Sequence, residues 1–178
     1  MINDRKMRYI RSEDGLDYYV FSPSLFRLYY NRTEEWTKHR KTFSHRFHML
    51  YYVLRGGLKI LYKMDGDEVV AYLIYTPAGR TVVQGSTRRD LFSVYITTNP
   101  AYRRQGHAAK LVSLLLTGLG LKWDTAYKTI QDSNIGSQKA AFANGYEAVC
   151  TVTKSRFFRT VKKKAGTRLK LYARQNNF

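Results

Sequence analysis

The stretch Arg103-Arg104-Gln105-Gly106-His107-Ala108 carries the most information about the fold of this sequence of 178 residues. It lies between a strand-like run, Leu91–Thr98, and a helix-like run, residues 109–121. A glycine and a small residue let backbone amides approach an anion, the N-terminus of a helix carries partial positive charge, and two guanidinium groups stand beside it. The stretch therefore predicts a binding site for a pyrophosphate group.

Length and composition predict one folded domain that spans residues 1–178. The content of 44% hydrophobic and 15% aromatic residues is typical of a globular core. The longest apolar run, around residues 111–116, is far shorter than the roughly 20 residues that a membrane span needs. Residues 1–14 are charged and lack the apolar core of a signal peptide, so we expect a soluble, cytoplasmic protein.

Cysteine and histidine usage argues against metal or disulfide chemistry. The single cysteine, Cys150, leaves no internal disulfide and no cysteine-based zinc site. Three of the four histidines lie on one basic segment without a carboxylate pattern that resembles a zinc motif. We therefore expect no metal.

The charge balance is strongly basic, with a net charge of +18. After Glu147 the chain contains nine Lys and Arg residues and no acidic residue. The positive electrostatic field of such a protein attracts anionic partners over long distances. The sequence therefore predicts a basic C-terminal surface.

Hydrophobic patterning predicts strands and helices in the order β, α, α, β, β, β, α, β, α, β, β. Residues 33–55 have apolar side chains at helical spacing, with glutamates in the first turn and glycines after the end. Two apolar runs, 58–64 and 68–76, flank Asp65-Gly66-Asp67 and predict a hairpin, and 77–89 predict a loop. The other predicted strands are residues 6–11, 90–98, 126–131, 147–153 and 168–173, and a basic connection at 154–167 joins the last two. The other predicted helices are a short one that begins at 22–24 and two more at 109–121 and 138–142.

The order of elements, together with the stretch from Asn99-Pro100 to Ala108, resembles the GCN5-related N-acetyltransferases. Their signature is Arg or Gln, two residues, Gly, one residue, then Gly or Ala, and this chain has Arg103, Gly106 and Ala108 at those places. The resemblance covers roughly residues 6–174. It implies an α/β (α+β) fold with a mixed, mostly antiparallel sheet flanked by helices, strands that splay at the CoA site, and N-acetyltransferase activity with acetyl-CoA as donor.

The same resemblance implies where acetyl-CoA binds. Backbone amides of residues 104–109 would hold the pyrophosphate, and main-chain groups of Ile96 and Thr98 would pair with the pantetheine arm as an added strand does. A backbone N–H near Thr98 would polarise the thioester carbonyl. The CoA-binding residues expected on this basis are Ile96, Thr98, Arg103, Arg104, Gln105, Gly106, His107, Ala108, Ala109, Asn134 and Ser137.

A second segment of the family is matched in part. Asn134, Ser137, Ala140, Gly145 and Tyr146 fall into its register. The position of the family's frequent tyrosine, which protonates the departing thiolate, is Ala141 here, and the neighbouring aromatic is Phe142, which has no proton to give. Either another group acts as the acid, or solvent does.

The sequence offers four candidates for proton transfer during direct attack of an amine on a thioester. Asp90 or Asp132 could act as a base through a water molecule. The alternative is that each carboxylate only stabilises a turn or caps a helix. Tyr95 and Tyr127 are candidate acids, and their alternative is packing in the core. No Cys-His or Ser-His-Asp arrangement suggests a covalent acyl-enzyme.

The acceptor is less defined than the donor. The excess of Lys and Arg favours a small anionic amine, such as a nucleotide-linked amino sugar. The alternatives are an aminoacyl-tRNA or an acidic acyl-carrier protein as acceptor or carrier. A different class of function is a degenerate acetyltransferase fold that binds nucleic acid through its basic surface. In that case Phe157, Phe158 and Tyr172 could stack on bases, unless they fill a core.

Overall fold

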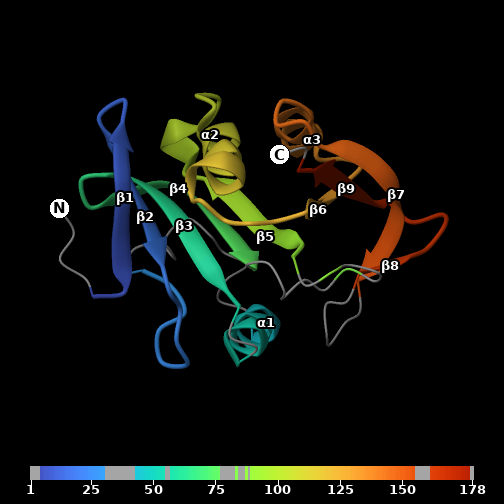
Figure 1. The fold of residues 1–178 in the computed structure, drawn as a ribbon, viewed down its shortest axis with the longest axis horizontal. Coiled ribbons are helices and arrows are strands. Elements are labelled where there is room, and N and C mark those ends of the chain that lie inside the picture. Colours follow the sequence, from blue (N-terminus) through green and yellow to red (C-terminus); the bar gives the residue numbers. More distant parts are fainter. Residues whose placement is uncertain are drawn as a thin grey trace.

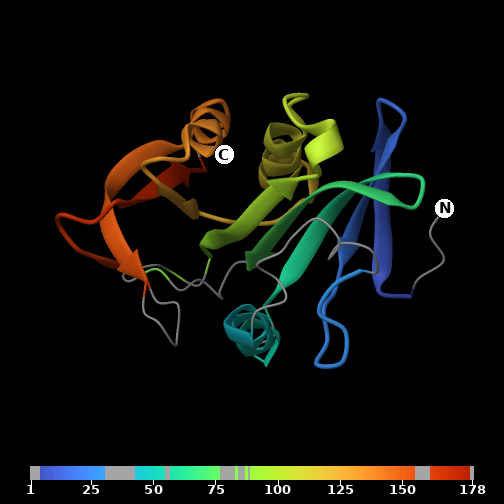
Figure 2. The same ribbon diagram turned by 180° about the vertical axis from the view of Figure 1, so that it is seen from behind.

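The computed structural model describes residues 5–30, 43–54, 57–76, 83, 87, 89–154 and 161–176. These residues form a nine-stranded sheet in the order β1-β2-β3-β4-β5-β6-β9-β7-β8. Helix α1 covers one face of the sheet, and α2 and α3 cover the other (Figure 1, Figure 2). The strands are β1 Met7–Glu13, β2 Leu16–Phe21, β3 Lys59–Asp65, β4 Glu68–Thr76, β5 Leu91–Thr98, β6 Thr125–Gln131, β7 Glu147–Lys154, β8 Val161–Lys163 and β9 Leu169–Gln175, and the helices are α1 Phe43–Leu54, α2 His107–Ser113 and α3 Ile135–Phe142.

The centre of the sheet splits between β5 and β6, which are the one parallel pair among the described strands. This pair holds for only three residue pairs, from Leu91 opposite Ala126 to Ser93 opposite Lys128. Beyond that point β5 continues to pair with β4 as far as Thr98, and β6 continues to pair with β9 as far as Gln131. The predicted mixed, mostly antiparallel sheet with splayed strands is therefore confirmed.

Side chains that alternate along the strands fill a core on each face of the sheet. On β3, Ile60 and Tyr62 pack on the side of α1, while Leu61 packs on the side of α2 and α3. All three are fully buried. No described helix is long and apolar enough to cross a membrane.

Two strands were missed by the sequence interpretation. Asp14 and Gly15 both have left-handed φ angles, of 55° and 72°, and they turn β1 directly into β2. The Asp-Gly signal for such a hairpin is present in the sequence. The short helix predicted to open at 22–24 is wrong, because Ser24 and Arg27 exchange backbone hydrogen bonds of 2.9 and 3.1 Å across a turn instead.

The second missed strand, β8, is three residues long and forms an edge of the sheet. It lies in the predicted connection 154–167, and Lys162 and Lys163 on it are exposed. Charged residues on a short edge strand protect it from pairing with other chains. Residues 33–42 and 55 of the predicted long helix, and most of the predicted loop 77–89, lie outside the described residues.

Candidate active site

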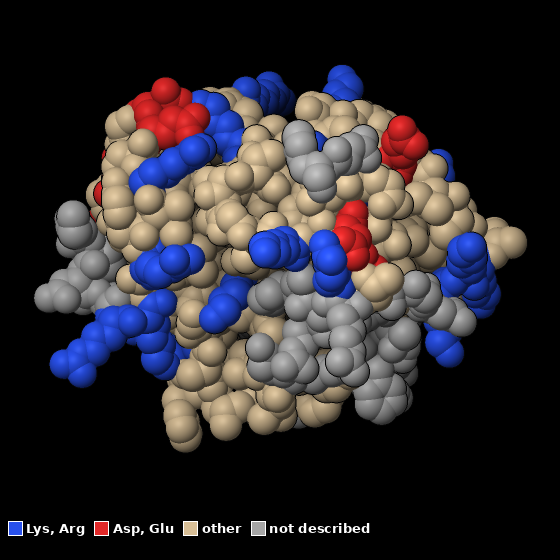
Figure 3. Space-filling model, viewed as in Figure 1, with Lys and Arg blue, Asp and Glu red and all other residues tan. Residues whose placement is uncertain are grey.

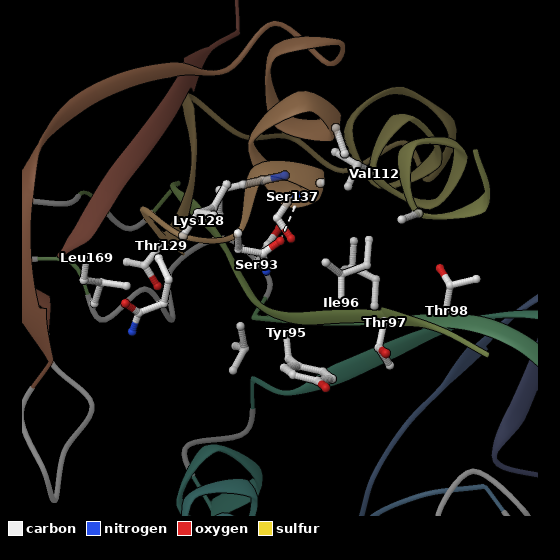
Figure 4. A pocket seen from close by; sticks show the side chains of 18 of the residues that line it. Ser93, Tyr95, Ile96, Thr97, Thr98, Val112, Lys128, Thr129, Ser137 and Leu169 are labelled. Atoms are coloured by element: carbon white, nitrogen blue, oxygen red, sulfur yellow. Dashed lines mark hydrogen bonds between the residues drawn. The ribbon is translucent and has the colours of Figure 1, made fainter. Parts of the chain in front are cut away.

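A cavity of about 670 Å³ lies where β5 and β6 separate. Its walls come from both strands, from α2, α3 and the loops that precede them, and from single residues of β4 and β9. Figure 4 shows these side chains around the opening. Within the described chain, residues 94–98 of β5 have no partner strand on the side of β6. Their backbone groups on that side therefore form an open strand edge at the cavity.

The turn that carries the opening motif lies at one end of this cavity. After β5, the Asn99 side chain accepts a hydrogen bond from the Ala101 amide at 3.2 Å and begins the 3-10 turn Pro100–Tyr102. Arg104 and Gly106 then take left-handed φ angles of 65° and 76°. Turns of this kind present backbone amides to an anion. Arg103 and Ala108 line the cavity, so the motif and the cavity form one site.

Nothing inside the protein crowds Gly106. A Cβ atom built at this position meets no other atom within 4 Å. The left-handed φ accounts for a glycine here, and the open space leaves room for a group from outside to approach the backbone. The site therefore fits a phosphate ligand.

The eleven residues predicted to bind CoA fall into two sets. The structure places six of them in the cavity wall and five in the turn and the first positions of α2, outside the wall. The six are Ile96, Thr98, Arg103, Ala108, Asn134 and Ser137, and the five are Arg104, Gln105, Gly106, His107 and Ala109. All of them remain predictions as ligand-binding residues.

His107 points into the protein rather than into the cavity. It is 8% exposed, its ring packs edge-on against Tyr102, and its Nε2 lies 3.2 Å from the Gln105 side-chain oxygen. Burial, and then the nearby charges of Lys63 and Lys110, lower the pKa of His107. A neutral ring at this place suits packing more than anion binding.

Helix α3 begins three residues earlier than the predicted 138–142. The Asn134 side chain accepts a hydrogen bond from the Ser137 amide at 3.0 Å and caps the helix. This cap holds both residues at the cavity wall. At the position where the resemblance expects a tyrosine, Ala141 is fully buried, and the neighbouring Phe142 is 54% exposed. No phenol reaches the site from this helix.

The two candidate aspartates lie outside the cavity wall. Asp90 is 2% exposed, and its carboxylate accepts hydrogen bonds from the Thr87 amide at 2.5 Å and the Thr125 amide at 3.1 Å. Asp132 forms an ion pair with Lys170 at 3.2 Å on the surface. Among the described residues that line the cavity there is no Asp, Glu or His.

The two candidate tyrosines differ in their relation to the cavity. Tyr95 contributes to the wall, but its ring stacks on Tyr72 at 6.0 Å and lies across β5 from Ser137 (Figure 4). Tyr127 does not contribute to the wall and packs against the core on the side of α1. Burial, and then the charge of Asp90, raise the pKa of Tyr127.

The sequence interpretation missed Lys128 on β6. Its side chain lines the cavity, is 7% exposed and has its Nζ 4.2 Å from the centre of the Tyr146 ring. Burial lowers the pKa of Lys128 to about 8. The signal was present, because Ala126, Lys128 and Ile130 alternate along a strand whose neighbours on that face are apolar.

Two further observations concern nucleic-acid binding and metal binding. Tyr172 is 1% exposed and packs against Phe142, so it does not stack on bases, and Phe157 and Phe158 lie outside the described residues. In the part of the chain that the structure describes, no group of three or more His, Cys, Asp or Glu residues could hold a metal ion.

Comparison with known proteins gives a likeness of fold. No family model matches the sequence, and no curated protein matches it. A GNAT-family acetyltransferase from Bacillus cereus superposes with a TM-score of 0.55 at 16% identity, over 89% of this chain and 96% of that one. An acetyltransferase from Thermus thermophilus gives 0.50 at 15% identity, over 67% of this chain and 65% of that one. A Bacillus subtilis acetyltransferase in complex with CoA gives 0.50 at 13% identity, over 68% and 78%. The chain therefore has the fold of the GCN5-related N-acetyltransferases.

Proposed function

We propose that this protein is an acetyl-CoA-dependent N-acetyltransferase that moves an acetyl group to a primary amine by direct attack. The observation that carries the proposal is the cavity between β5 and β6, with the turn of residues 103–108 at its mouth. The open edge of β5 and the amide-rich turn meet at this one place. A ligand that joins a diphosphate to a peptide-like arm matches both features.

The strand edge suits the pantetheine arm. From Thr98 to Ser93, β5 extends five residues, which is about 17 Å at the rise of a strand. The arm contains two amide units in series and is an extended chain of comparable length. Its amides can pair with backbone groups of Ile96 and Thr98, beyond the end of the pairing with β6, as an added strand does.

The mouth of the cavity suits the diphosphate. Arg103 is exposed and lines the cavity there, and the helical segment that follows Gly106 continues from α2 into the π-helical turn Leu114–Gly118. Backbone amides at the start of that segment, with the guanidinium of Arg103, would bind the negative charge. The acyl end of the donor would then lie at the inner end of the cavity.

The inner end of the cavity has features that help thioester aminolysis. On β5 the pairing with β4 shifts register, so that Val94 has no partner between Ser93 and Tyr95. Such bulges redirect backbone groups, and an N–H redirected in this way can hydrogen-bond to the thioester oxygen, a role that the sequence interpretation gave to an N–H near Thr98. The described wall contains no cysteine to carry an acyl group and no carboxylate to act as base. We infer direct attack by an amine that loses its proton to solvent.

Charge supports an anionic acceptor. The chain has 31 Lys and Arg residues against 13 Asp and Glu. On the face shown in Figure 3, Lys and Arg are spread widely and acidic side chains are few. A positive field of this kind concentrates negatively charged substrates. A small anionic amine, such as a nucleotide-linked amino sugar, is the acceptor that we propose.

Calorimetric titration with acetyl-CoA tests the donor. We expect saturable binding to the wild-type protein and none to Gly106→Glu, because a carboxylate side chain would fill the space that the diphosphate needs. Gly166→Glu is the matched control, since Gly166 also has a left-handed φ, of 72°, and no atom within 4 Å of a built Cβ. Absence of binding to the wild-type protein, or equal loss in both variants, would contradict the proposal.

A screen for release of CoA tests the acceptor. Small amines, amino sugars, aminoacyl-tRNA and acyl-carrier protein are each added to protein and acetyl-CoA. We expect release with anionic amines and a decrease in rate as salt screens the attraction. Release only with tRNA or with a carrier protein would replace the small amine by that acceptor.

A further inference from the structure

Lys128 lies at the point where the two central strands separate. It faces Ser93 in the last residue pair that joins β5 to β6. Beyond this pair the strands diverge, so Lys128 stands at the inner end of the cavity. Figure 4 shows its side chain reaching toward Ser137 on α3, on the side of β5 opposite to Tyr95.

The ammonium group of Lys128 has no acidic neighbour in the described structure. Its Nζ lies over the ring of Tyr146, and no hydrogen bond or ion pair joins it to another described residue. The other cation in the described wall, Arg103, is at the mouth. A buried positive charge without a counterion attracts negative charge that appears close to it. The inner end of the cavity is therefore suited to a group that becomes negative.

The position of that group follows from the proposed function, on which this inference rests. With the diphosphate at the turn 103–108 and the arm along β5, the thioester sulfur comes to the end of the parallel pair, near Ser93 and Lys128. When the C–S bond breaks, the sulfur becomes a thiolate. Ala141 offers no hydroxyl, and the Tyr95 ring lies on the other side of β5.

We propose that Lys128 stabilises the CoA thiolate as it departs. The acceptor nitrogen forms a bond to the acyl carbon, the C–S bond breaks, and its electron pair moves to sulfur. The Lys128 ammonium keeps its proton and lies beside the negative sulfur. The proton of the acceptor amine passes to solvent, and the thiolate takes a proton from solvent.

The protonation state of Lys128 suits this role. Burial lowers its pKa to about 8, so the side chain is charged at neutral pH. A thiolate beside it favours the charged form further. The ammonium therefore keeps its charge while the sulfur departs.

The test measures the pKa of the CoA thiol in the binary complex and needs no acceptor. Thiolate absorbance in the ultraviolet is followed against pH for wild-type, Lys128→Met and Lys122→Met proteins saturated with CoA. An opposite charge nearby lowers a pKa by about one to three units. We expect that shift with the wild-type protein and with Lys122→Met, whose Lys122 is exposed and outside the cavity wall, and its loss with Lys128→Met.

Desulfo-CoA, which lacks the sulfur, separates this inference from the proposed function. It should bind wild-type and Lys128→Met proteins equally, because Lys128 acts on the sulfur alone. Failure of the wild-type protein to bind CoA or desulfo-CoA overturns the proposed function. Binding of both, with the same thiol pKa in wild-type and Lys128→Met proteins, overturns the role of Lys128 and leaves the function standing. Loss of desulfo-CoA binding in Lys128→Met also overturns it, since Lys128 would then hold another part of the ligand.

A second variant keeps the charge and changes the side chain. Lys128→Arg keeps a cation that does not release a proton near neutral pH. It should keep the low thiol pKa, and with an amine that the screen identifies it should keep more of the wild-type kcat than Lys128→Met. Equal losses of kcat in the two variants would contradict a role for the charge.

Discussion

Replacing Asp90 by Asn should destabilise the protein and leave acetyl-CoA binding intact. The buried carboxylate joins two segments, because it accepts the Thr87 amide before β5 and the Thr125 amide at the start of β6. Asparagine keeps one acceptor oxygen and places an NH2 group opposite the other amide. The loss of one hydrogen bond to a charged group costs about 1.5–3 kcal/mol. Asp90→Ala loses both, about 3–6 kcal/mol, and risks unfolding.

Urea denaturation followed by circular dichroism measures this cost. With a typical slope of about 2 kcal/mol per M, Asp90→Asn should lower the midpoint by about 1 M. Asp132→Asn is the matched control, because its ion pair with Lys170 is about 41% exposed and contributes about 0–1 kcal/mol. A wild-type midpoint for Asp90→Asn, combined with loss of acetyl transfer, would refute the structural role and favour Asp90 as a base.

Two further predictions follow from charged groups at the cavity. Lys128→Met should raise the free energy of unfolding by up to about 3 kcal/mol at pH 7, since the folded pKa of Lys128 is about 8 and the ordinary value is 10.5. Because the unfolded chain binds this proton more tightly, the stability of the wild-type protein rises between pH 8 and 10.5 relative to the variant. Urea titrations at pH 7 and pH 10 should therefore show a smaller difference in the free energy of unfolding between the two proteins at pH 10. The same difference in the free energy of unfolding at both pH values would contradict burial of the ammonium. Arg103→Gln should weaken acetyl-CoA binding about tenfold at low salt, and calorimetry should show a smaller difference at high salt, as screening predicts. Arg168→Gln, at an exposed position outside the cavity wall, should bind like the wild-type protein, and an equal loss there would point to a general field effect.

Local sequence was sufficient for several features because their causes lie within a few residues. The strand β5, the hairpin around Gly66 and a glycine-containing loop at residues 103–108 were all predicted from neighbouring residue types. The likeness to the acetyltransferase fold rested on that turn and its place between a strand and a helix. The missed strand β2 was also signalled locally, by Asp14-Gly15, but its own run contains Asp17 and looks less regular.

Other features depend on which segments meet, and the sequence leaves that open. Asp90 could be a base or a structural acceptor until the fold brings the Thr125 amide to it from 35 residues away. The cavity exists because the parallel pairing of β5 and β6 stops after Ser93 and Lys128, while each strand continues with a different partner. The sequence by itself determined a turn that suits a diphosphate. The tertiary structure alone decided that a buried lysine stands at the far end of the same cavity, because burial and distance are properties of packing between segments rather than of spacing along the chain.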